Sequence, residues 1–295
     1  MTSTPRLAAL CTSLLLVLPA LGRAEEPPTW QSLIDGGKCR EAEALCVPWL
    51  SSKDTERKVE ARKCLANAAL CGQDVVSVQS NESGGGYLGP GYRPEAIEKA
   101  LSNLNEGLKL APQDLSIHQG RLHLLMVSGR FDEMAKALDE SCRLYSAPDE
   151  LEDWLPYVSE LFDAGQYNAA LLLLKVLDAS FPNNHEVVAN IGSVLAMQEK
   201  DEEALTYMER AVKLAPEDPL NSWNLARLYD YTGKLEQADI WYQKALRLET
   251  DPQTRSSGAC THAAFVETKL KDRKRACELQ KANCPENKRT ACSGQ

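Results

Sequence analysis

The sequence lacks the short motifs by which many enzymes and metalloproteins are recognised. It contains neither H-E-x-x-H nor G-x-S-x-G, and no two of its cysteines form a C-x-x-C pair. It has only four histidines, and the closest two, His118 and His123, fall on different faces of a helix. We therefore expect no catalytic residue, no metal site and no cofactor, and we predict that the protein is not an enzyme.

Long apolar runs are also missing, except at the N-terminus. There, Leu7 to Leu21 form an apolar run of 15 residues behind Arg6, and small residues precede Glu25. This order is typical of a secretory signal peptide, whereas 15 residues are short for a membrane anchor. We predict that a signal peptide, residues 1–24, is cleaved after Ala24. The mature chain would then be periplasmic or secreted, with no membrane span.

Basic residues are outnumbered by acidic ones. The chain has 33 Lys and Arg against 42 Asp and Glu, and its formal net charge is −9. Loss of residues 1–24 removes Arg6 and Arg23 and no acidic residue, which brings the net charge near −11. Because Lys and Arg drive binding to phosphate groups, this balance argues against nucleic acid and anionic membranes as main partners.

What the sequence does contain is an internal repeat of 34 residues. Residues 185–218 align with residues 219–252, and small or apolar residues coincide at matching positions. The matched pairs are Ile191 with Leu225, Gly192 with Ala226, Ala204 with Ala238, Met208 with Tyr242 and Ala211 with Ala245. The period and the small residues resemble the tetratricopeptide repeat (TPR), a helix–turn–helix unit. Small residues at these positions let two antiparallel helices approach closely.

The resemblance extends towards the N-terminus through Trp154, Gly165, Gly129 and Gly37, which occupy matching positions in earlier units. It implies an all-α fold, a right-handed α-solenoid of about six repeats with a C-terminal capping helix. The expected segments are 25–71 (the first unit and the first helix of the second), 72–95 (an insertion loop), 96–114 (the second helix of unit two), the units 115–150, 151–184, 185–218 and 219–252, and 253–295 (a cysteine-rich, basic capping tail).

Two cysteine pairs with the same spacing occur near the N-terminus: Cys39 with Cys46, and Cys64 with Cys71. In the repeat register they lie on consecutive helices, which run antiparallel. Such helices bring together residues whose numbers have a constant sum, as 39 with 71 and 46 with 64 do. We therefore predict disulfides Cys39–Cys71 and Cys46–Cys64. A zinc site is the alternative, but zinc-binding cysteines usually stand closer together in sequence.

The other cysteines of the mature chain are an isolated one and a C-terminal group. We expect Cys142, on a predicted repeat helix, to be a buried free thiol. Cys260, Cys277, Cys284 and Cys292 crowd the tail and are expected to be bridged, in a pairing that the sequence leaves open.

Partner-binding residues are expected in two places. The resemblance implies a concave groove lined by the first helix of each unit. On this chain it assigns partner contacts to Asn190, Met197, Trp223, Asn224, Arg227 and Tyr231. Asparagine can both donate to and accept from a peptide backbone, and Trp, Tyr and Arg are enriched at binding hot spots. The insertion adds Tyr87 and Tyr92 as aromatic contacts, with a plain linker as the alternative for this segment.

From these features we predict a scaffold or assembly factor of the cell envelope that binds a protein or an extended peptide segment. One alternative is a regulatory or binding subunit of an exported enzyme or of a polysaccharide or secretion machine. A second alternative is a hydrolase or redox enzyme with its site in the insertion and tail.

Overall fold

A computed structural model describes residues 28–73, 91–284 and 290–292, so the predicted signal peptide and most of the insertion lie outside the described residues. Within these ranges the chain forms fourteen α-helices, and no β-strand is found among them. The helices are α1 (Trp30–Asp35), α2 (Cys39–Cys46), α3 (Thr55–Leu70), α4 (Pro94–Leu110), α5 (Leu115–Val127), α6 (Phe131–Cys142), α7 (Leu155–Asp163), α8 (Tyr167–Ser180), α9 (His185–Met197), α10 (Asp201–Leu214), α11 (Pro219–Tyr231), α12 (Leu235–Leu248), α13 (Pro252–Thr268) and α14 (Arg273–Asn283). Short 3-10 helices cover Val47–Ser51 (η1), Pro148–Asp153 (η2) and Thr290–Cys292 (η4).

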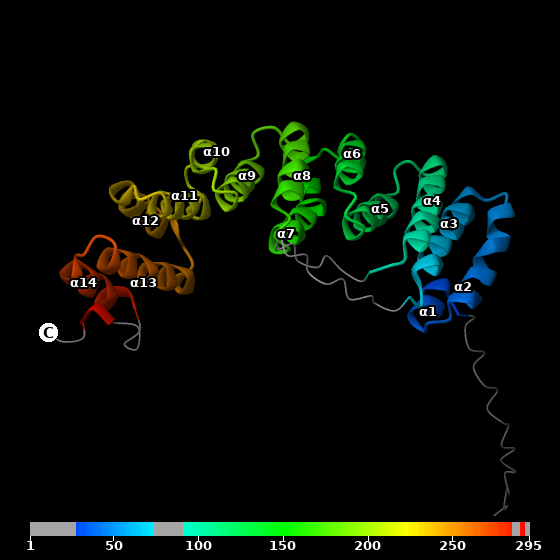
Figure 1. Cartoon of the computed structure of the whole chain (residues 1–295), viewed down its shortest axis with the longest axis horizontal. Helices are drawn as coiled ribbons and strands as arrows, with labels where there is room; N and C mark the ends of the chain where they lie inside the picture. The colour runs from blue at the N-terminus through cyan, green and yellow to red at the C-terminus, as the bar shows by residue number, and fades with distance from the viewer. Residues whose placement is uncertain (1–27, 74–90, 285–289, 293–295) are drawn as a thin grey trace, which may run out of the picture.

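The helices stack into a right-handed α-solenoid that curves as an arc, as predicted (Figure 1). Helices α1 to α12 form six helix–turn–helix units. In the middle of the array, α5, α7 and α9 lie on the inner side of the arc, and α6 and α10 lie on the outer side. The inner surface is therefore built mainly from the first helix of each unit.

Turns within the units share a left-handed backbone conformation. Gly129, Gly165 and Gly233 each follow the first helix of a unit, with φ of 69°, 70° and 76°. Unit five has Glu199 at this position, 34 residues after Gly165, and its φ is 59°. A residue with a Cβ atom adopts this conformation at a cost, whereas glycine does not. The backbone of Glu199 is thus strained, whereas the glycines at the same position of the neighbouring units are not.

Close packing within each unit depends on the small residues of the repeat. Ala204, Ala226 and Ala238 have no exposed surface. A Cβ atom on Gly192 would lie 3.0 Å from Met208 Cγ and 3.2 Å from the carbonyl oxygen of Ala204. These contacts leave little room for a side chain at position 192, and the buried alanines show a similarly close approach of helices at the other small positions of the repeat.

A small, separate core holds the first unit together. It consists of Leu33, Ala42, Cys46, Cys64 and Leu65, apart from the main core that runs through the rest of the array. The disulfide Cys46–Cys64 lies inside it. The disulfide Cys39–Cys71 joins the first residue of α2 to the residue that follows α3. These are the two predicted pairs. Because so small a core contributes little stability by itself, the disulfides add a needed constraint.

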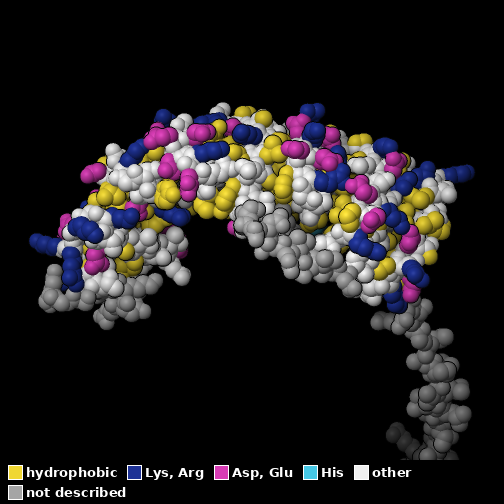
Figure 2. All heavy atoms as spheres, in the orientation of Figure 1, with side chains coloured by type: hydrophobic (Ala, Val, Ile, Leu, Met, Phe, Trp, Pro, Cys, Tyr) yellow, Lys and Arg dark blue, Asp and Glu magenta, His cyan; other side chains and the backbone are white. Residues whose placement is uncertain are grey.

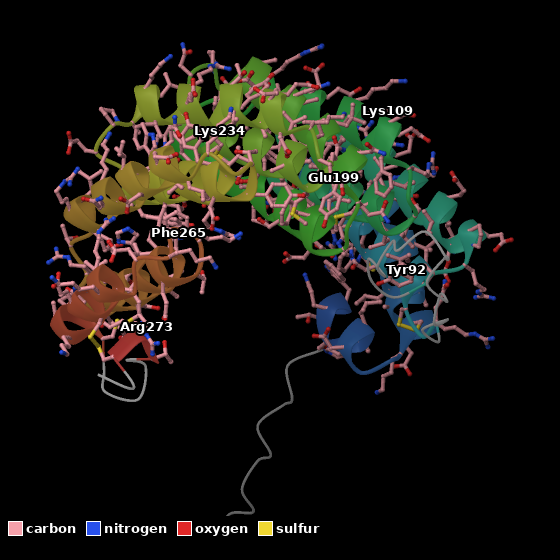
Figure 3. All side chains as sticks on the ribbon, turned by 60° about the vertical axis from the view of Figure 1, so that its left-hand side comes forward. Tyr92, Lys109, Glu199, Lys234, Phe265 and Arg273 are labelled. Atoms are coloured by element: carbon pink, nitrogen blue, oxygen red, sulfur yellow. A yellow bond between two sulfur atoms is a disulfide. The ribbon has the colours of Figure 1, made fainter. Side chains whose placement is uncertain are left out.

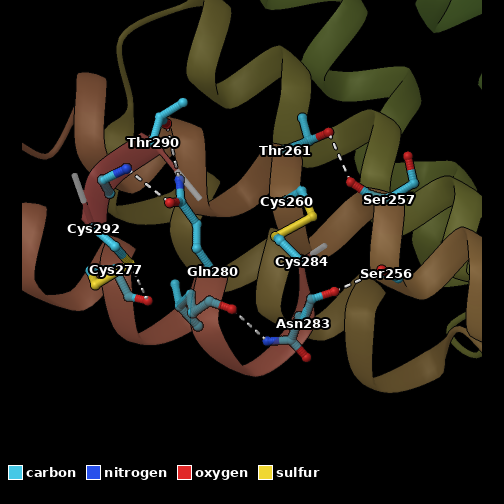
Figure 4. Close-up of a disulfide and its surroundings, with 12 residues drawn as sticks. Ser256, Ser257, Cys260, Thr261, Cys277, Gln280, Asn283, Cys284, Thr290 and Cys292 are labelled. Atoms are coloured by element: carbon cyan, nitrogen blue, oxygen red, sulfur yellow. Dashed lines mark hydrogen bonds between the residues drawn. A yellow bond between two sulfur atoms is a disulfide. The ribbon is translucent and has the colours of Figure 1, made fainter. Parts of the chain in front are cut away.

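The tail differs from the single capping helix that the sequence predicts, because it contains two helices, α13 and α14, followed by η4. Disulfides Cys260–Cys284 and Cys277–Cys292 tie these elements to one another (Figure 4). Gln280 adds a hydrogen bond, in which its Oε1 accepts from the Ala291 amide at 2.9 Å. Both bridges are internal to the tail, so neither links it covalently to the last repeat.

A partly buried polar cluster attaches the tail to α12. The carboxylate of Asp239 accepts a 2.6 Å hydrogen bond from Nε2 of His262 on α13. It also accepts two hydrogen bonds, of 2.8 and 2.9 Å, from the guanidinium of Arg275 on α14. The His262 ring packs against Tyr242 and Phe265, which also contact each other. Burial raises the pKa of Asp239, but the hydrogen bonds from Arg275 and His262 outweigh it and hold the pKa below 3.8.

Cys142, the one cysteine of the described residues that forms no disulfide, is a buried free thiol, as predicted. Burial raises its pKa to about 11, although a hydrogen bond with Ser180 opposes the shift. A thiol with so high a pKa is almost entirely protonated at neutral pH and is a poor nucleophile.

Candidate functional site

A cavity of about 860 Å³ opens where α7, α9 and α11 lie side by side. In the space-filling view, hydrophobic side chains gather along the inner edge of the arc in this region (Figure 2). The cavity combines apolar walls with amide, hydroxyl and charged groups. Its lining residues are Val158, Ser159, Phe162, Asp163, Asn190, Ser193, Val194, Ala196, Met197, Glu199, Met208, Asn224, Arg227, Leu228 and Tyr231.

Five of the predicted partner contacts line this cavity: Asn190, Met197, Asn224, Arg227 and Tyr231. They come from α9 and α11, at corresponding positions of units five and six. Asn190 and Asn224 are 34 residues apart, and so are Met197 and Tyr231. The repeat therefore places like side chains in rows across neighbouring helices.

Trp223, the remaining predicted contact of α9 and α11, does not line the cavity. Its ring packs edge-to-face on Tyr242, with the centroids 4.8 Å apart. It also lies within 3.3 Å of the position that a Cβ atom on Gly258 of α13 would occupy. The reason is that α13 stacks on the last repeat as a further helix, so Trp223 is a packing contact between the array and its cap.

Tyr92, one of the two predicted tyrosines of the insertion, does not line this cavity either. Tyr92 is half-buried, packs on the main core beside the start of α4, and lies towards the N-terminal end of the array (Figure 3). Tyr87 lies outside the described residues.

Three polar side chains that line the cavity form no hydrogen bond within the part of the protein that the structure describes. The side chains of Asn190, Asn224 and Arg227 make no hydrogen bond or ion pair with any other described residue. In contrast, the hydroxyls of Ser159 and Ser193 donate to backbone carbonyls of their own helices, at 3.3 and 3.1 Å. The two amides and the guanidinium are therefore free to bind a group from outside.

Large apolar side chains are unusually exposed beside these polar groups. Met197 is 50% exposed and Tyr231 is 65% exposed. Phe162 packs edge-to-face on Tyr167, with the centroids 5.5 Å apart, which fixes its ring at the cavity wall. Exposed apolar surface rimmed by polar groups often marks an interaction site.

Sequence reasoning missed Asp163, Glu199 and Met208 as lining residues. Asp163 is in the same row as Met197 and Tyr231, so the repeat register held a signal for it. Glu199 is in the turn after α9, a position that the register assigns to glycine and not to the groove. Met208 belongs to α10, the second helix of unit five, and reaches the cavity through the space left by Gly192.

Outside the cavity, Ser141 and His118 form a serine–histidine pair of the kind seen in catalytic sites, but here the pair connects two helices. Ser141 Oγ lies 2.9 Å from Nδ1 of His118, while Nε2 of this histidine lies 2.8 Å from the carbonyl oxygen of Pro112. Both side chains are buried, between α5 and α6. Each ring nitrogen is thus engaged with the protein, and the pair holds the two helices of unit three together.

Neither a metal cluster nor a membrane helix is found in the part of the chain that the structure describes. No group of three or more His, Cys, Asp and Glu side chains there is placed to hold a metal ion. None of the helices in these ranges has the length and the apolar character needed to cross a bilayer.

Two sequence models described as "Tetratricopeptide repeat" match the chain, one over residues 185–218 and one over residues 224–256. These matches, with the stacked helix–turn–helix units, show that the chain is a tetratricopeptide-repeat protein. Comparison with curated protein sequences finds no match.

Solved structures resemble the fold at low sequence identity. The C-terminal part of a TPR repeat-containing protein from Cytophaga hutchinsonii is 11% identical, with a TM-score of 0.52 over 90% of this chain and 98% of that one. MamA from Desulfovibrio magneticus RS-1 is 21% identical, with a TM-score of 0.36 over 52% and 85% of the two chains. YrrB, described as a TPR protein with an unusual peptide-binding site, is 16% identical, with a TM-score of 0.39 over 77% and 96%. The first of these likenesses shows that the solenoid fold extends over most of the array.

Proposed function

We propose that this protein is an exported scaffold or assembly factor that holds an extended segment of a partner protein in the cavity between α7, α9 and α11. The observation that carries the proposal is the set of unused hydrogen-bonding groups in that cavity. Asn190 and Asn224 each offer a donor and an acceptor, which is what an extended peptide backbone presents. Their spacing by one repeat suits a ligand that crosses from one unit to the next.

The apolar groups of the cavity supply the rest of the binding surface. Met197 and Tyr231 are exposed side chains that lose water contact when a ligand side chain covers them. Tyrosine and arginine dominate binding energy at many interfaces because they combine large contact area with directional polar groups. An affinity in the micromolar range, about −8 kcal/mol, is a reasonable expectation for one short segment.

Export is supported by the disulfides. Eight cysteines form four bridges among the described residues, and bridges of this kind persist in oxidising compartments. Together with the signal peptide predicted in residues 1–24, they favour the periplasm or the exterior of the cell. A partner would then be an envelope or secreted protein.

The test is a pull-down from the envelope fraction of the source cell, followed by an affinity measurement with the captured protein. Asn190→Ala/Asn224→Ala and Arg227→Ala should each weaken binding by about tenfold or more, because each removes a polar contact at the centre of the site. A matched variant, Asn105→Ala/Arg247→Ala, removes the same residue types from exposed positions on α4 and α12. It should bind like the wild type.

Circular dichroism and thermal melting of each variant separate loss of binding from loss of folding. Equal affinity of the wild type and both cavity variants would refute the proposal. It would move attention to the insertion or the tail as the binding region.

A further inference from the structure

The charged groups of the cavity specify what kind of segment it holds. We infer that the ligand carries a basic residue towards unit four and an acidic residue towards unit six, on either side of an apolar side chain. This inference rests on the proposed function, because it describes the segment bound at that site. Its basis is the arrangement of Asp163, Glu199 and Arg227, which sequence reasoning did not bring together.

Two carboxylates form one side of the cavity without a positive partner in the described chain. Asp163 is the last residue of α7, and Glu199 follows the C-terminal end of α9. Both side chains are exposed, and neither makes an ion pair with another described residue. The C-terminal end of a helix carries partial negative charge, so an acidic residue there is unfavourable for the isolated protein. This side of the cavity is complementary to a positively charged group.

Of the two carboxylates, Glu199 points more strongly to a ligand, because its backbone conformation lowers the stability of the folded protein. It adopts a left-handed conformation, with φ of 59°, at the position where Gly129, Gly165 and Gly233 stand in other units. Glycine would adopt that conformation without strain. Local strain that nothing in the surrounding packing repays is often associated with function. A role for the carboxylate in the cavity accounts for the presence of glutamate.

Arg227 gives the other side of the cavity the opposite charge. It lies in the middle of α11, is exposed, and has no carboxylate partner among the described residues. The apolar surface of Met197 and Tyr231 is close to these two charged regions. In array order the cavity presents Asp163 of unit four, Glu199 and Met197 of unit five, and Arg227 and Tyr231 of unit six, so its negative charge lies towards unit four and its positive charge towards unit six.

The helix geometry sets the spacing between the two ligand charges. Neighbouring packed helices lie about 10 Å apart, and each residue advances about 1.5 Å along a helix. Arg227 is about 13 Å from Glu199 on this estimate, and it is farther from Asp163, which belongs to the next unit along the array. An extended chain covers about 3.4 Å per residue, so the basic and acidic residues of the ligand should be separated by about four to six positions.

The test is selection of binders from a phage-displayed library of random peptides on the full, disulfide-bonded chain. Wild-type protein should enrich peptides with a basic and an acidic residue in one constant order, about four to six positions apart around an apolar residue. The charge-reversed variant Asp163→Lys/Glu199→Lys/Arg227→Glu should enrich the opposite order.

A matched control reverses three exposed charges that lie outside the cavity and have no partner among the described residues: Glu217→Lys/Glu278→Lys/Arg247→Glu. It should select the same peptides as the wild type, which excludes an effect of overall charge.

Glu199→Gly separates a binding role from a structural one. This variant should melt at a higher temperature than the wild type, since strain is relieved, and should bind the selected peptides about three- to tenfold more weakly. Equal affinity would overturn the role assigned to Glu199.

The outcomes distinguish this inference from the proposed function. One outcome would overturn the inference and leave the proposed function standing: the selected peptides show no charge pattern, but their binding still depends on Asn190 and Asn224. The same result follows if the charge-reversed variant keeps the wild-type order. No enrichment over the Asn190→Ala/Asn224→Ala variant would overturn both.

Discussion

Replacement of Asp239 by alanine should detach the tail from the array. Asp239 on α12 accepts hydrogen bonds from His262 on α13 and from Arg275 on α14, so one carboxylate connects all three helices. No disulfide does so, because both tail bridges lie within the tail. The attachment therefore depends on this cluster, on the aromatic contacts of Tyr242 with His262 and Phe265, and on the ion pair between Lys269 and Asp230.

The magnitude follows from what the substitution leaves behind. The His262 side chain is 1% exposed, so its Nε2–H group would be buried without an acceptor, at a cost of about 1–3 kcal/mol. Arg275 is 34% exposed and regains water, so its lost pairing contributes only about 0.5–1 kcal/mol. Asp239→Ala should thus destabilise the docked tail by about 2–4 kcal/mol.

The assay is hydrogen exchange of the backbone amides in α13 and α14, combined with chemical denaturation. Exchange in both helices should accelerate together, whereas α9 and α10 should keep their protection, because units of a repeat array depend mainly on their neighbours. Glu278→Ala removes an exposed carboxylate from α14 with no described partner and serves as the control. Wild-type exchange in α13 of the Asp239→Ala protein would refute the reasoning.

Further predictions concern pH, packing and thiol reactivity. Burial lowers the pKa of His262 below 6.5 despite the hydrogen bond to Asp239, so the unfolded chain takes up the proton first. The stability that neutral His262 contributes is present above pH 6.5 and should decrease as the pH falls below it, by at most about 1.4 kcal/mol per pH unit; thermal melting against pH measures this. Gly192→Ala should destabilise the protein by about 1–3 kcal/mol, because the new Cβ atom clashes with α10. Gly120→Ala, whose new Cβ atom makes an ordinary 3.5 Å contact, should be neutral or should stabilise the protein by up to about 1 kcal/mol. Chemical denaturation measures both effects. Cys142 should resist alkylation in the folded protein and be the one thiol labelled after denaturation without reductant, as counted by mass spectrometry of residues 28–292.

The repeat architecture could be predicted because close packing restricts the sequence at regular intervals. Gly192 and Ala204 are small because their helices touch, and the same restriction recurs every 34 residues. The pairing of Cys39 with Cys71 follows from the same regularity, since consecutive antiparallel helices fix which residues face each other. Periodic contacts leave a periodic pattern that a sequence can show.

The tail could not be predicted in the same way because it breaks the period. Four cysteines allow three pairings, and no register selects Cys260–Cys284 and Cys277–Cys292 among them. The packing of Trp223 depends on α13, whose position is set by the Asp239 cluster and not by a repeat. For the same reason, the sequence alone did not predict the contact of Trp223 with Gly258 of the cap.

Of the three charged side chains of the cavity, Glu199 is the one outside the periodic pattern, because Arg227 was assigned to the groove from the register and Asp163 is in the row of Met197 and Tyr231. The position of Glu199 is occupied by glycine in other units and is expected to form the turn between two helices. The register therefore does not assign Glu199 to the groove. Its side chain reaches the cavity because the turn after α9 lies at the same end as Asp163 of α7. Deviations from a repeat, rather than the repeat itself, distinguish one TPR groove from another.

The two ends of the array are secured by different means, and this difference bears on the cavity. At the N-terminus, disulfides join helices of two units, so fraying there is limited covalently. At the C-terminus, the tail is cross-linked only to itself and docks on the last unit through non-covalent contacts. Helix α11 carries both Trp223, which lies next to Gly258 of the tail, and Arg227, which lines the cavity. Under the proposed function, a ligand that orders α11 also favours docking of the tail, and by linkage the docked tail favours the ligand to the same extent.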